Sequence, residues 1–411
     1  MSGGGRVSRR PAWLSRNLLL LTLVSLTQDA ASELMYPLLP LLITGVLAAP
    51  PVVLGVVEGC AEAAAGISKY VAGRWSDTAG RKPFVTAGYG LAAVGKIVVA
   101  AAIGWPMVLI GRVVDRLGKG VRSAPRDALI ADSVPPEAYG RAFGFHRMGD
   151  TLGAVIGPLL ALLALSLLNN DVRAALWWAI VPAIASMLLT LMIVEPRRSR
   201  PGPDPQAEAA TSDPKIATVE FGPARTPLPR PFWRVAIVLV AIAVVNFPDV
   251  LLLLRVSDLG FSTTQVVLAY VLFNLVYTLA SYPAGALSDR IPRAAVYGIG
   301  LLAFAVGYLG LGLVGGGPWV FVLIGVYGLF PALTDGVGKA WISGLVPSEM
   351  RGRAQGVFQA LGNGAVFVAG LWAGLLWTVG PGGGVIPLLV SGSLAAVAGV
   401  FLLVRQRSLH S

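Results

Sequence analysis

The sequence predicts an all-α membrane protein with twelve transmembrane helices in two six-helix repeats. Of its 411 residues, 55% are hydrophobic and only 13% are charged, with a mean hydropathy of +0.73, whereas soluble globular domains carry about 25% charged residues. Apolar segments of about 20 residues, enough to cross a bilayer as a helix, recur along the chain. The sequence also repeats itself at an offset of 212 residues, for example between Val134 and Val346.

The apolar segments predict six membrane spans in each half of the chain. The first six lie near 17–44, 51–72, 84–104, 106–131, 142–167 and 174–194, and the second six lie near 232–254, 263–283, 294–314, 318–340, 354–378 and 384–404. Between these sets, the sequence is rich in Pro, Arg, Asp and Ser, which is typical of a flexible linker. We therefore expect an N-terminal six-helix bundle over 1–194, a linker over 195–231 and a C-terminal six-helix bundle over 232–411.

The basic residues between the spans predict the orientation in the membrane. One side of the predicted helices holds both chain termini, the linker and the loops with Arg74, Arg81, Lys82, Arg141, Arg290, Arg293, Arg351 and Arg353. The other side holds only Arg173 and Arg255. Because positively charged loops stay in the cytoplasm, we expect a multi-pass protein of the inner (plasma) membrane with cytoplasmic termini. The same loops explain the net charge of +11, so we expect no nucleic-acid partner.

Few residues suit catalysis or metal binding. Cys60 is the only cysteine, which excludes an intrachain disulfide and a cysteine-rich metal site. The two histidines, His146 and His410, stand alone in the sequence, and no nucleophile–base pair or phosphate-binding loop is recognisable. We expect a monomer that is not an enzyme and that holds neither a metal nor a cofactor.

The fourth predicted span carries the most charge. Residues 111–127 contain seven charged side chains, and six of them follow steps of three and four along one stripe of the helix: Arg112, Asp115, Arg116, Lys119, Arg122 and Arg126. A charged side chain at the centre of a lipid-facing helix costs about 2.5–3.5 kcal/mol on insertion scales. The stripe must therefore face protein, water or a counter-charge, and it indicates a polar pathway.

Acidic residues accompany this stripe in neighbouring spans. Asp29 and Glu33 share one face of the first span, and Glu58 and Glu62 share one face of the second. Two further acids are candidates for the same pathway, Asp150 in the fifth span and Asp249 in the seventh.

The repeat shows that the basic stripe belongs to the first half alone. At the offset of 212, its positions correspond to Ile324, Gly328, Pro331 and Thr334. We therefore expect the chemistry to be concentrated in the first half, with the second half as a packing and rocking partner.

Two roles for these charges are compatible with the sequence. One is a network of salt bridges that joins helices without exchanging protons, which we favour for Asp115 and Arg116 because each has an adjacent opposite charge. The other is proton binding during transport. We favour it for the four acids of the first two spans, because they repel one another and protonation relieves the repulsion. The excess of cations in the fourth span indicates an anionic or zwitterionic cargo, unless the acids neutralise it.

The loop between the second and third spans carries a motif. Residues 73–82 read Gly-Arg-Trp-Ser-Asp-Thr-Ala-Gly-Arg-Lys and resemble the signature loop of the major facilitator superfamily (MFS). Transporters of this superfamily have two six-helix repeats with a substrate site between the halves. The second copy, residues 285–293, departs from the motif with Pro292 in place of Gly. Together with the span count and the repeat, the resemblance covers essentially the whole chain.

Residues 115–127 extend the resemblance to a prokaryotic subgroup. They match its fourth-helix sequence, Asp-Arg-x-Gly-Lys-Gly-x-Arg-x-x-Pro-Arg-Asp. The substrates of that subgroup are mostly undefined, so this match implies the transport machinery and leaves the cargo open.

The resemblance implies that the signature loop is a latch between the two halves on the cytoplasmic side. Gly73 and Gly80 permit a tight turn, and Asp77 can approach the N-terminus of the eleventh helix, where the helix dipole favours an anion by about 0.3–1 kcal/mol. Arg81 and Lys82 can pair with acids on neighbouring helix ends. The alternative is a solvated basic turn that only sets topology.

The fifth span resembles the helix 5 motif of MFS antiporters. Gly153, Gly157 and Pro158 give Gly-x-x-x-Gly-Pro, in which the glycines permit close helix packing and the proline bends the helix. The usual following Gly-Gly is absent, so the pattern favours export only in part, and helix packing alone explains it as well. We expect His146, near the cytoplasmic end of this span, to be solvated.

We therefore expect a secondary active transporter that exports a small solute by alternating access, coupled to protons and surrounded by membrane lipids. A uniporter, a symporter or a lipid or metal carrier on the same fold is the alternative within transport. A non-transporting membrane sensor or assembly partner is the alternative from another class.

Overall fold

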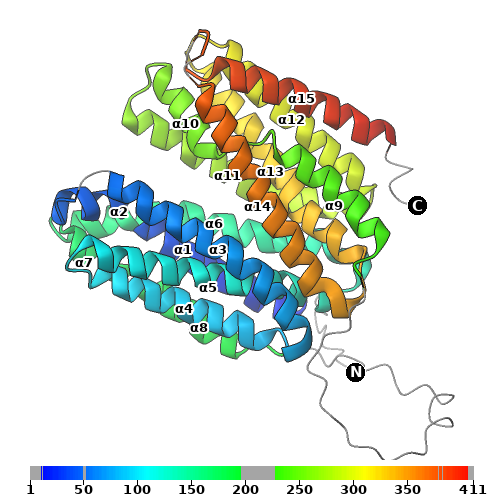
Figure 1. Cartoon of the computed structure of the whole chain (residues 1–411), viewed down its shortest axis with the longest axis horizontal. Coiled ribbons are helices and arrows are strands. Elements are labelled where there is room, and N and C mark those ends of the chain that lie inside the picture. The colour runs from blue at the N-terminus through cyan, green and yellow to red at the C-terminus, as the bar shows by residue number, and fades with distance from the viewer. Residues whose placement is uncertain are drawn as a thin grey trace, which may run out of the picture.

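The computed structural model describes residues 11, 13–49, 52–195, 227–377, 379–381 and 383–405. These residues form helices and connecting turns, without a strand among them. Figure 1 shows two helical bundles, with the N-terminal bundle (blue to green) below the C-terminal bundle (green to red). The prediction of an all-α protein with two repeats is confirmed. Most of the predicted linker, residues 196–226, lies outside the described residues.

The N-terminal bundle begins with a broken first crossing. Its helices are α1 (Arg16–Met35), α2 (Leu38–Pro40), the π-helical turn η1 (Leu41–Val46), α3 (Val52–Ala79), α4 (Lys82–Ala100), α5 (Trp105–Asp132), the 3-10 turn η2 (Pro136–Ala138), α6 (Tyr139–Leu167), α7 (Val172–Trp178) and α8 (Ile180–Leu191). The Ser15 hydroxyl caps α1 by accepting a hydrogen bond from the backbone N–H of Leu18. The predicted span near 17–44 is interrupted within its length, because the α-helix ends at Met35, just before Pro37.

The C-terminal bundle repeats this plan with a broken seventh crossing. Its helices are α9 (Arg230–Ala243), α10 (Asp249–Asp258), α11 (Thr263–Ser288), α12 (Arg293–Leu313), α13 (Trp319–Gly344), the 3-10 turn η4 (Ser348–Met350), α14 (Arg351–Leu375) and α15 (Val385–Arg405). The predicted span over 232–254 is therefore two helices, since Pro248 ends the irregular segment and starts α10.

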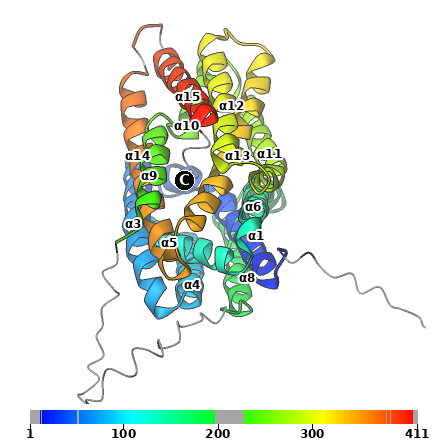
Figure 2. The same cartoon turned by 90° about the vertical axis from the view of Figure 1, so that its right-hand side faces the viewer.

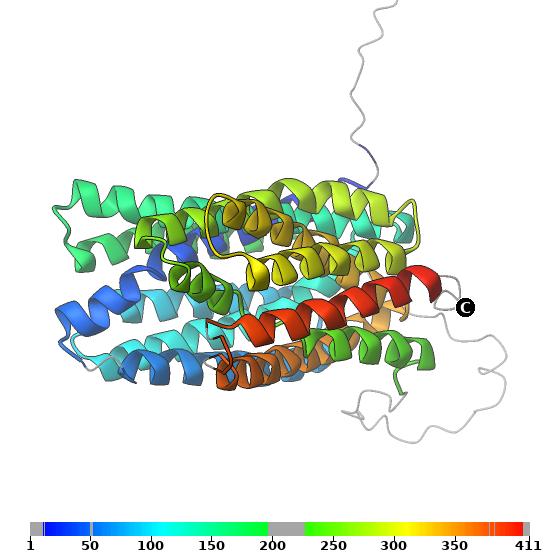
Figure 3. The ribbon, with the colours of Figure 1, turned by 90° about the horizontal axis from the view of Figure 1, so that it is seen from above.

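Eight of the described helical segments are long and apolar enough to cross a bilayer on their own. The helices α3 and α5 are as long, with 28 residues each, and carry many of the acids and bases that the sequence places inside the membrane. Figure 3 shows that most helices of both bundles run along one shared direction, which suits a protein whose helices cross a membrane side by side.

Connections between helices alternate between the two ends of the molecule. We call the end with the turns at 80–81, 133–138, 289–292 and 345–350 the basic end, because Arg81, Arg290, Arg293 and Arg351 lie there or at the adjoining helix starts. The other end, with the turns at 101–104, 168–171, 259–262 and 314–318, is called the opposite end.

Two seams join the bundles. Viewed from the basic end in Figure 2, α3 lies against α14 on one side and α6 lies against α11 on the other. Glycines permit the close approach: a Cβ added to Gly73 would lie 2.7 Å from the carbonyl oxygen of Gly352. On the other seam, a Cβ added to Gly285 would lie 2.1 Å from the carbonyl oxygen of Gly140. Small residues at helix contacts have this role in membrane proteins generally.

Candidate transport pathway between the bundles

Two aspartates fasten the seams at the basic end. The Asp77 carboxylate accepts hydrogen bonds from the backbone N–H groups of Gly352 (3.0 Å) and Arg353 (2.6 Å), at the N-terminus of α14. Asp289 does the same for Gly140 (2.7 Å) and Arg141 (2.9 Å), at the N-terminus of α6. Free N–H groups and the helix dipole make a helix N-terminus a favourable place for a carboxylate.

Asp77 thus lies where the signature motif predicts. Asp289 was not among the predicted site residues. The sequence could have identified it, because the repeat offset of 212 aligns it with Asp77. We call the two contacts together the aspartate clamps. Their arrangement makes the basic end closed in this structure, and their action as a releasable latch remains a prediction.

Arg81 strengthens the first clamp. Its guanidinium forms an ion pair with Asp132 and donates a hydrogen bond to the carbonyl oxygen of Ser348, in the C-terminal bundle. Arg351 of the C-terminal bundle also forms an ion pair with Asp132, at 2.6 Å. Among the described residues, the ammonium group of Lys82 donates to the carbonyl oxygen of Leu191 (3.0 Å), and its pairing with an acid stays a prediction.

The turn of the signature motif depends on Gly80. Its φ of +89° lies in the region that only glycine adopts without strain. The turn brings the backbone N–H groups of Arg81 and Lys82 to the carboxylate of Glu195, at 2.6 and 3.2 Å. The first residue of the predicted linker is therefore tied to the turn of the motif.

A cavity of about 480 Å³ lies between the bundles. Residues of α1, α3, α5 and α6 line it from one bundle, and residues of α9 to α14 line it from the other. Its charged lining residues are Asp29, Glu33, Lys69, Lys119, Arg122, Arg126, Arg147, Asp150, Asp249, Asp335 and Lys339. Among the described residues, the side-chain contacts between the bundles around the cavity, such as Arg147–Asp335 and Lys339–Asp127, lie in the half of each helix nearer the basic end.

Half of the predicted pathway residues line this cavity. They are Asp29, Glu33, Lys119, Asp150 and Asp249. The other five, Glu58, Glu62, Arg112, Asp115 and Arg116, are outside the cavity lining and pair with one another between α3 and α5. The charged stripe of α5 therefore has two parts along its length. One part forms an ion-pair cluster with α3, and the other part lines the cavity.

The cluster at Asp115 is buried and almost fully paired. Lys96 Nζ lies 2.7 Å from Asp115 Oδ1, and Arg112 Nη1 lies 3.2 Å from Asp115 Oδ2. Arg112 also donates two hydrogen bonds, of 2.9 and 2.8 Å, to the carboxylate of Glu58. This bidentate geometry fits an arginine–carboxylate pair that joins helices. The position of Glu58 therefore favours a structural role over the proton-binding role that its spacing suggested.

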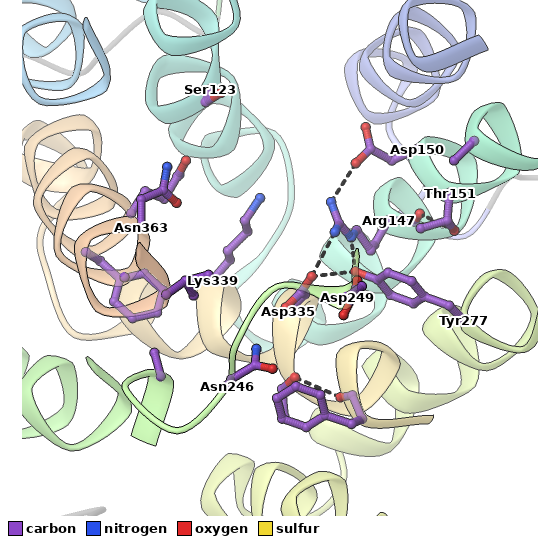
Figure 4. A pocket seen from close by; sticks show the side chains of 18 of the residues that line it. Ser123, Arg147, Asp150, Thr151, Asn246, Asp249, Tyr277, Asp335, Lys339 and Asn363 are labelled. Carbon is purple, nitrogen blue, oxygen red and sulfur yellow. Dashed lines mark hydrogen bonds and ion pairs between the residues drawn. The ribbon is translucent and has the colours of Figure 1, made fainter. Parts of the chain in front are cut away.

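Arg147 occupies the centre of the contact between the bundles, and the sequence did not identify it. Its guanidinium pairs with Asp150 (2.7 Å) on its own helix and with Asp335 (2.8 Å) on α13. Tyr277 hydrogen-bonds to both Arg147 and Asp335. Figure 4 shows this chain running across the cavity from Asp150 to Asp335. The sequence could have identified Arg147 as a site residue, because it places a charged side chain inside an apolar helix.

A second ion pair joins the bundles next to the cavity. Asp127 on α5 pairs with Lys339 on α13 at 2.8 Å and accepts a hydrogen bond from Gln359 on α14 at 2.9 Å. Asp335 therefore pairs with a cation of the N-terminal bundle, and Lys339, four residues further along α13, pairs with an anion of that bundle. The second half therefore contributes charged partners to the cavity, while most of the charged lining residues belong to the first half, where the chemistry is expected.

Asp29 and Asp150 face each other across the contact between α1 and α6. Their carboxyl groups lie within hydrogen-bonding reach of each other. Gly153 permits this, because a Cβ there would lie 2.4 Å from the carbonyl oxygen of Leu26. A Cβ at Gly157 would lie 2.6 Å from Glu33 Cβ. The glycines of the predicted helix 5 motif, followed by Pro158 within α6, therefore allow the acids of α1 to approach α6.

His146 is buried, so the prediction of a solvated histidine is wrong. Only 2% of its surface is exposed, and Nε2 lies 2.9 Å from the hydroxyl of Ser25 on α1. In the C-terminal bundle, Asp249 accepts a hydrogen bond of 2.6 Å from Tyr327. Within the described part of the chain, these groups do not assemble into a cluster that could hold a metal ion.

The two repeats with a charged cavity between them define a secondary transporter fold. The Major Facilitator Superfamily model matches residues 21–255 and 250–411, and the chain belongs to this family. An uncharacterized MFS-type transporter of Methanocaldococcus jannaschii is 30% identical over 397 residues, 95% of each chain. The multidrug resistance protein MdtH of Aeromonas salmonicida is 25% identical over 312 residues, 72% of each chain.

Solved structures agree on the fold. The human organic anion transporter MFSD10 superposes with a TM-score of 0.72 at 18% identity, covering 96% of this chain and 100% of that one. The transporter FucP in its outward conformation gives 0.71 at 14% identity, with coverage of 96% and 99%. At these identities the likeness concerns the fold alone.

Proposed function

We propose that the protein is a proton-coupled transporter that exports a small solute across the inner membrane by alternating access. The family membership makes transport the established part of this statement. Proton coupling, export and orientation are our inferences. The arginine-rich loops of the basic end support a cytoplasmic location for that end, for the termini and for the linker.

The proton-coupling proposal rests on one observation, the chain Asp29–Asp150–Arg147–Asp335. Two carboxyl groups within hydrogen-bonding reach are most favourable when they share one proton. Asp150 is also the partner of Arg147, which reaches the C-terminal bundle through Asp335. Gain or loss of that proton changes the charge that holds Arg147, and therefore the strength of the contact between the bundles.

Two observations support export over import. The glycines and proline of α6 resemble the helix 5 motif of antiporters, and a relative covering 72% of the chain is named a multidrug resistance protein. A uniporter, symporter or lipid or metal carrier remains the alternative within transport. The cavity lined by charges of both bundles favours transport over a sensor, an assembly partner or an enzyme.

The test is transport into proteoliposomes with an imposed pH gradient, screened with organic anions, cationic drugs and sugars. Uptake of the transported compound is expected to depend on the gradient. In Asp29→Asn, which removes the shared proton site, gradient-driven accumulation should fall to the level of protein-free liposomes, while exchange without a gradient persists.

The matched control is Glu137→Gln, which neutralises an exposed carboxylate outside the cavity and should behave as the unmodified protein. Transport that ignores the gradient in the unmodified protein would remove the coupling proposal. Gradient-dependent accumulation that is normal in Asp29→Asn would remove the role of Asp29.

A further inference from the structure

The cations that line the cavity fall into two groups. Arg126, Arg147 and Lys339 each form an ion pair with an aspartate. Three others have no ion pair with an acid anywhere in the described residues: Lys69 on α3, and Lys119 and Arg122 on α5. We call these three the cation triad.

Arg122 is the most informative member of the triad. Only 4% of its surface is exposed, yet Nη1 has no hydrogen-bond partner. The guanidinium group of Arg122 also lies over the Tyr89 ring, with its central carbon 4.5 Å from the ring centre. A buried charged donor without an acceptor is costly, and the side chain that carries this donor lines the cavity. An anion in the cavity would satisfy it.

The two lysines complete a site for an anion. Lys119 is exposed, and it lines the same cavity. Lys69 is buried, and its ammonium group lies 2.7 Å from the neutral side-chain amide of Asn363. The charged stripe of α5 therefore contains two kinds of cation. Arg112 and Arg116 are neutralised by Glu58 and Glu62. Lys119 and Arg122 remain available to a ligand.

Several acids limit the charge of the triad, and one of them is Glu62 of α3, which acts on both Lys69 and Lys119. Asp29 and Glu33 line the cavity from α1, and Asp29 lies within hydrogen-bonding reach of Asp150. Asp249 and Asp335 line it from the C-terminal bundle, where they bond to Tyr327 and to Arg147. A proton shared by Asp29 and Asp150 leaves the triad with an excess of positive charge.

Aromatic side chains form the wall contributed by the C-terminal bundle. Tyr270, Phe273 and Tyr277 of α11 line the cavity with Phe330 of α13. Consecutive ring centres are 6.3 Å apart from Tyr270 to Phe273 and 6.0 Å apart from Phe273 to Tyr277. Such rings stack on planar ligands, and a cavity of about 480 Å³ lies in the range of about 300–1,000 Å³ that holds drug-sized molecules.

We propose that the cavity binds an organic anion with a planar aromatic body. The cation triad holds the anionic group, and the rings of α11 and α13 hold the body. This inference rests on the proposed function, since the ligand is the transported solute.

The experiment measures binding to purified protein in detergent, without a membrane gradient, by equilibrium dialysis and thermal shift. The probes are naphthoate, neutral naphthamide, cationic naphthylmethylammonium and the non-aromatic anion cyclohexanecarboxylate. Naphthoate is expected to bind and raise the melting temperature, and the other three are expected to bind more weakly. Arg122→Gln and Lys119→Gln should each lower naphthoate affinity about tenfold or more, because each removes one charge that holds a desolvated anion.

The control is Arg234→Gln, which removes a positive charge exposed on α9 outside the cavity and should leave naphthoate affinity unchanged. Lys119 is exposed, so its variant remains informative even if Arg122→Gln fails to fold. The proposal is overturned if naphthoate does not bind at millimolar concentration, if the ammonium probe binds as tightly, or if both triad variants bind naphthoate normally.

The binding experiment and the transport experiment test the anion site and the proton coupling separately, so either proposal can be overturned without the other. Naphthoate binding without any response of transport to a pH gradient would keep the anion site and remove proton coupling. Gradient-driven movement of a cationic drug, with no naphthoate binding, would keep the proposed transporter and overturn the anion site.

Discussion

Replacing Asp115 by asparagine is expected to cause the largest loss of stability among single changes of charge in the protein. Asn keeps the shape of the side chain but, among the described residues, removes the one acid that pairs with Lys96 and one of the two that pair with Arg112. Breaking a buried ion pair in this way costs about 3–5 kcal/mol. The thermal unfolding midpoint in detergent micelles is expected to fall accordingly.

Two comparison variants separate this explanation from general fragility. Glu62→Gln removes an ion pair whose carboxylate side chain is 57% exposed, so its cost should stay below about 1 kcal/mol. Combining Asp115→Asn with Lys96→Met removes the uncompensated ammonium group while Arg112 keeps Glu58, and should recover much of the lost stability. If the double variant is no more stable than Asp115→Asn, the unpaired charge is not the cause.

Removing both aspartate clamps, by Asp77→Ala with Asp289→Ala, is expected to open the basic end. Each carboxylate accepts two backbone hydrogen bonds from the other bundle, and a hydrogen bond to a charged group contributes about 1.5–3 kcal/mol. Every 1.4 kcal/mol changes a population about tenfold, so the open form should increase at least about tenfold.

The measurement is the labelling rate of a cysteine introduced at the cavity residue Ser123, on a Cys60→Ser background. An impermeant maleimide added from the basic side should react faster when the clamps are absent. Asp171→Ala is the matched control, because this aspartate also caps a helix, α7, but at the opposite end. Equal labelling of the clamp variant and the control would contradict the latch.

The sequence was sufficient for the architecture because bilayer thickness and backbone hydrogen bonding leave few choices. Apolar length predicts the spans, and the repeat at 212 residues predicts two bundles of one orientation. The break before α10 was missed, although Pro248 marks it, because hydropathy continues across a break whose polar groups are satisfied by neighbouring helices. Tyr308, for example, donates a hydrogen bond to the carbonyl oxygen of Phe247.

The site was only partly predictable, because periodicity gives the face of a helix and not its partner. The spacing in α5 places Arg112 and Lys119 on one stripe, but only the fold shows that Arg112 meets Glu58 while Lys119 lines the cavity. The pairing of Arg147 with Asp335 joins residues 188 positions apart, and nothing local in the sequence indicates it.

The burial of His146 has the same explanation. Its position near the end of a span suggested solvent, but the basic end is closed by the clamps, and α1 supplies Ser25 as a hydrogen-bonding partner. Closure of that end is a property of the conformation, which a pattern of residue types does not encode.

Alternating access through the charged cavity is tested most directly by two distances between spin labels in lipid nanodiscs. One pair, at Thr78 and Arg290, reports on the basic end, and the other, at the exposed residues Ile103 and Leu313, reports on the opposite end. As the pH is varied, a second population is expected in which the first distance lengthens while the second shortens, and removal of the clamps should enrich it. A single, unchanging distance at both ends, or lengthening of both together, would contradict the account.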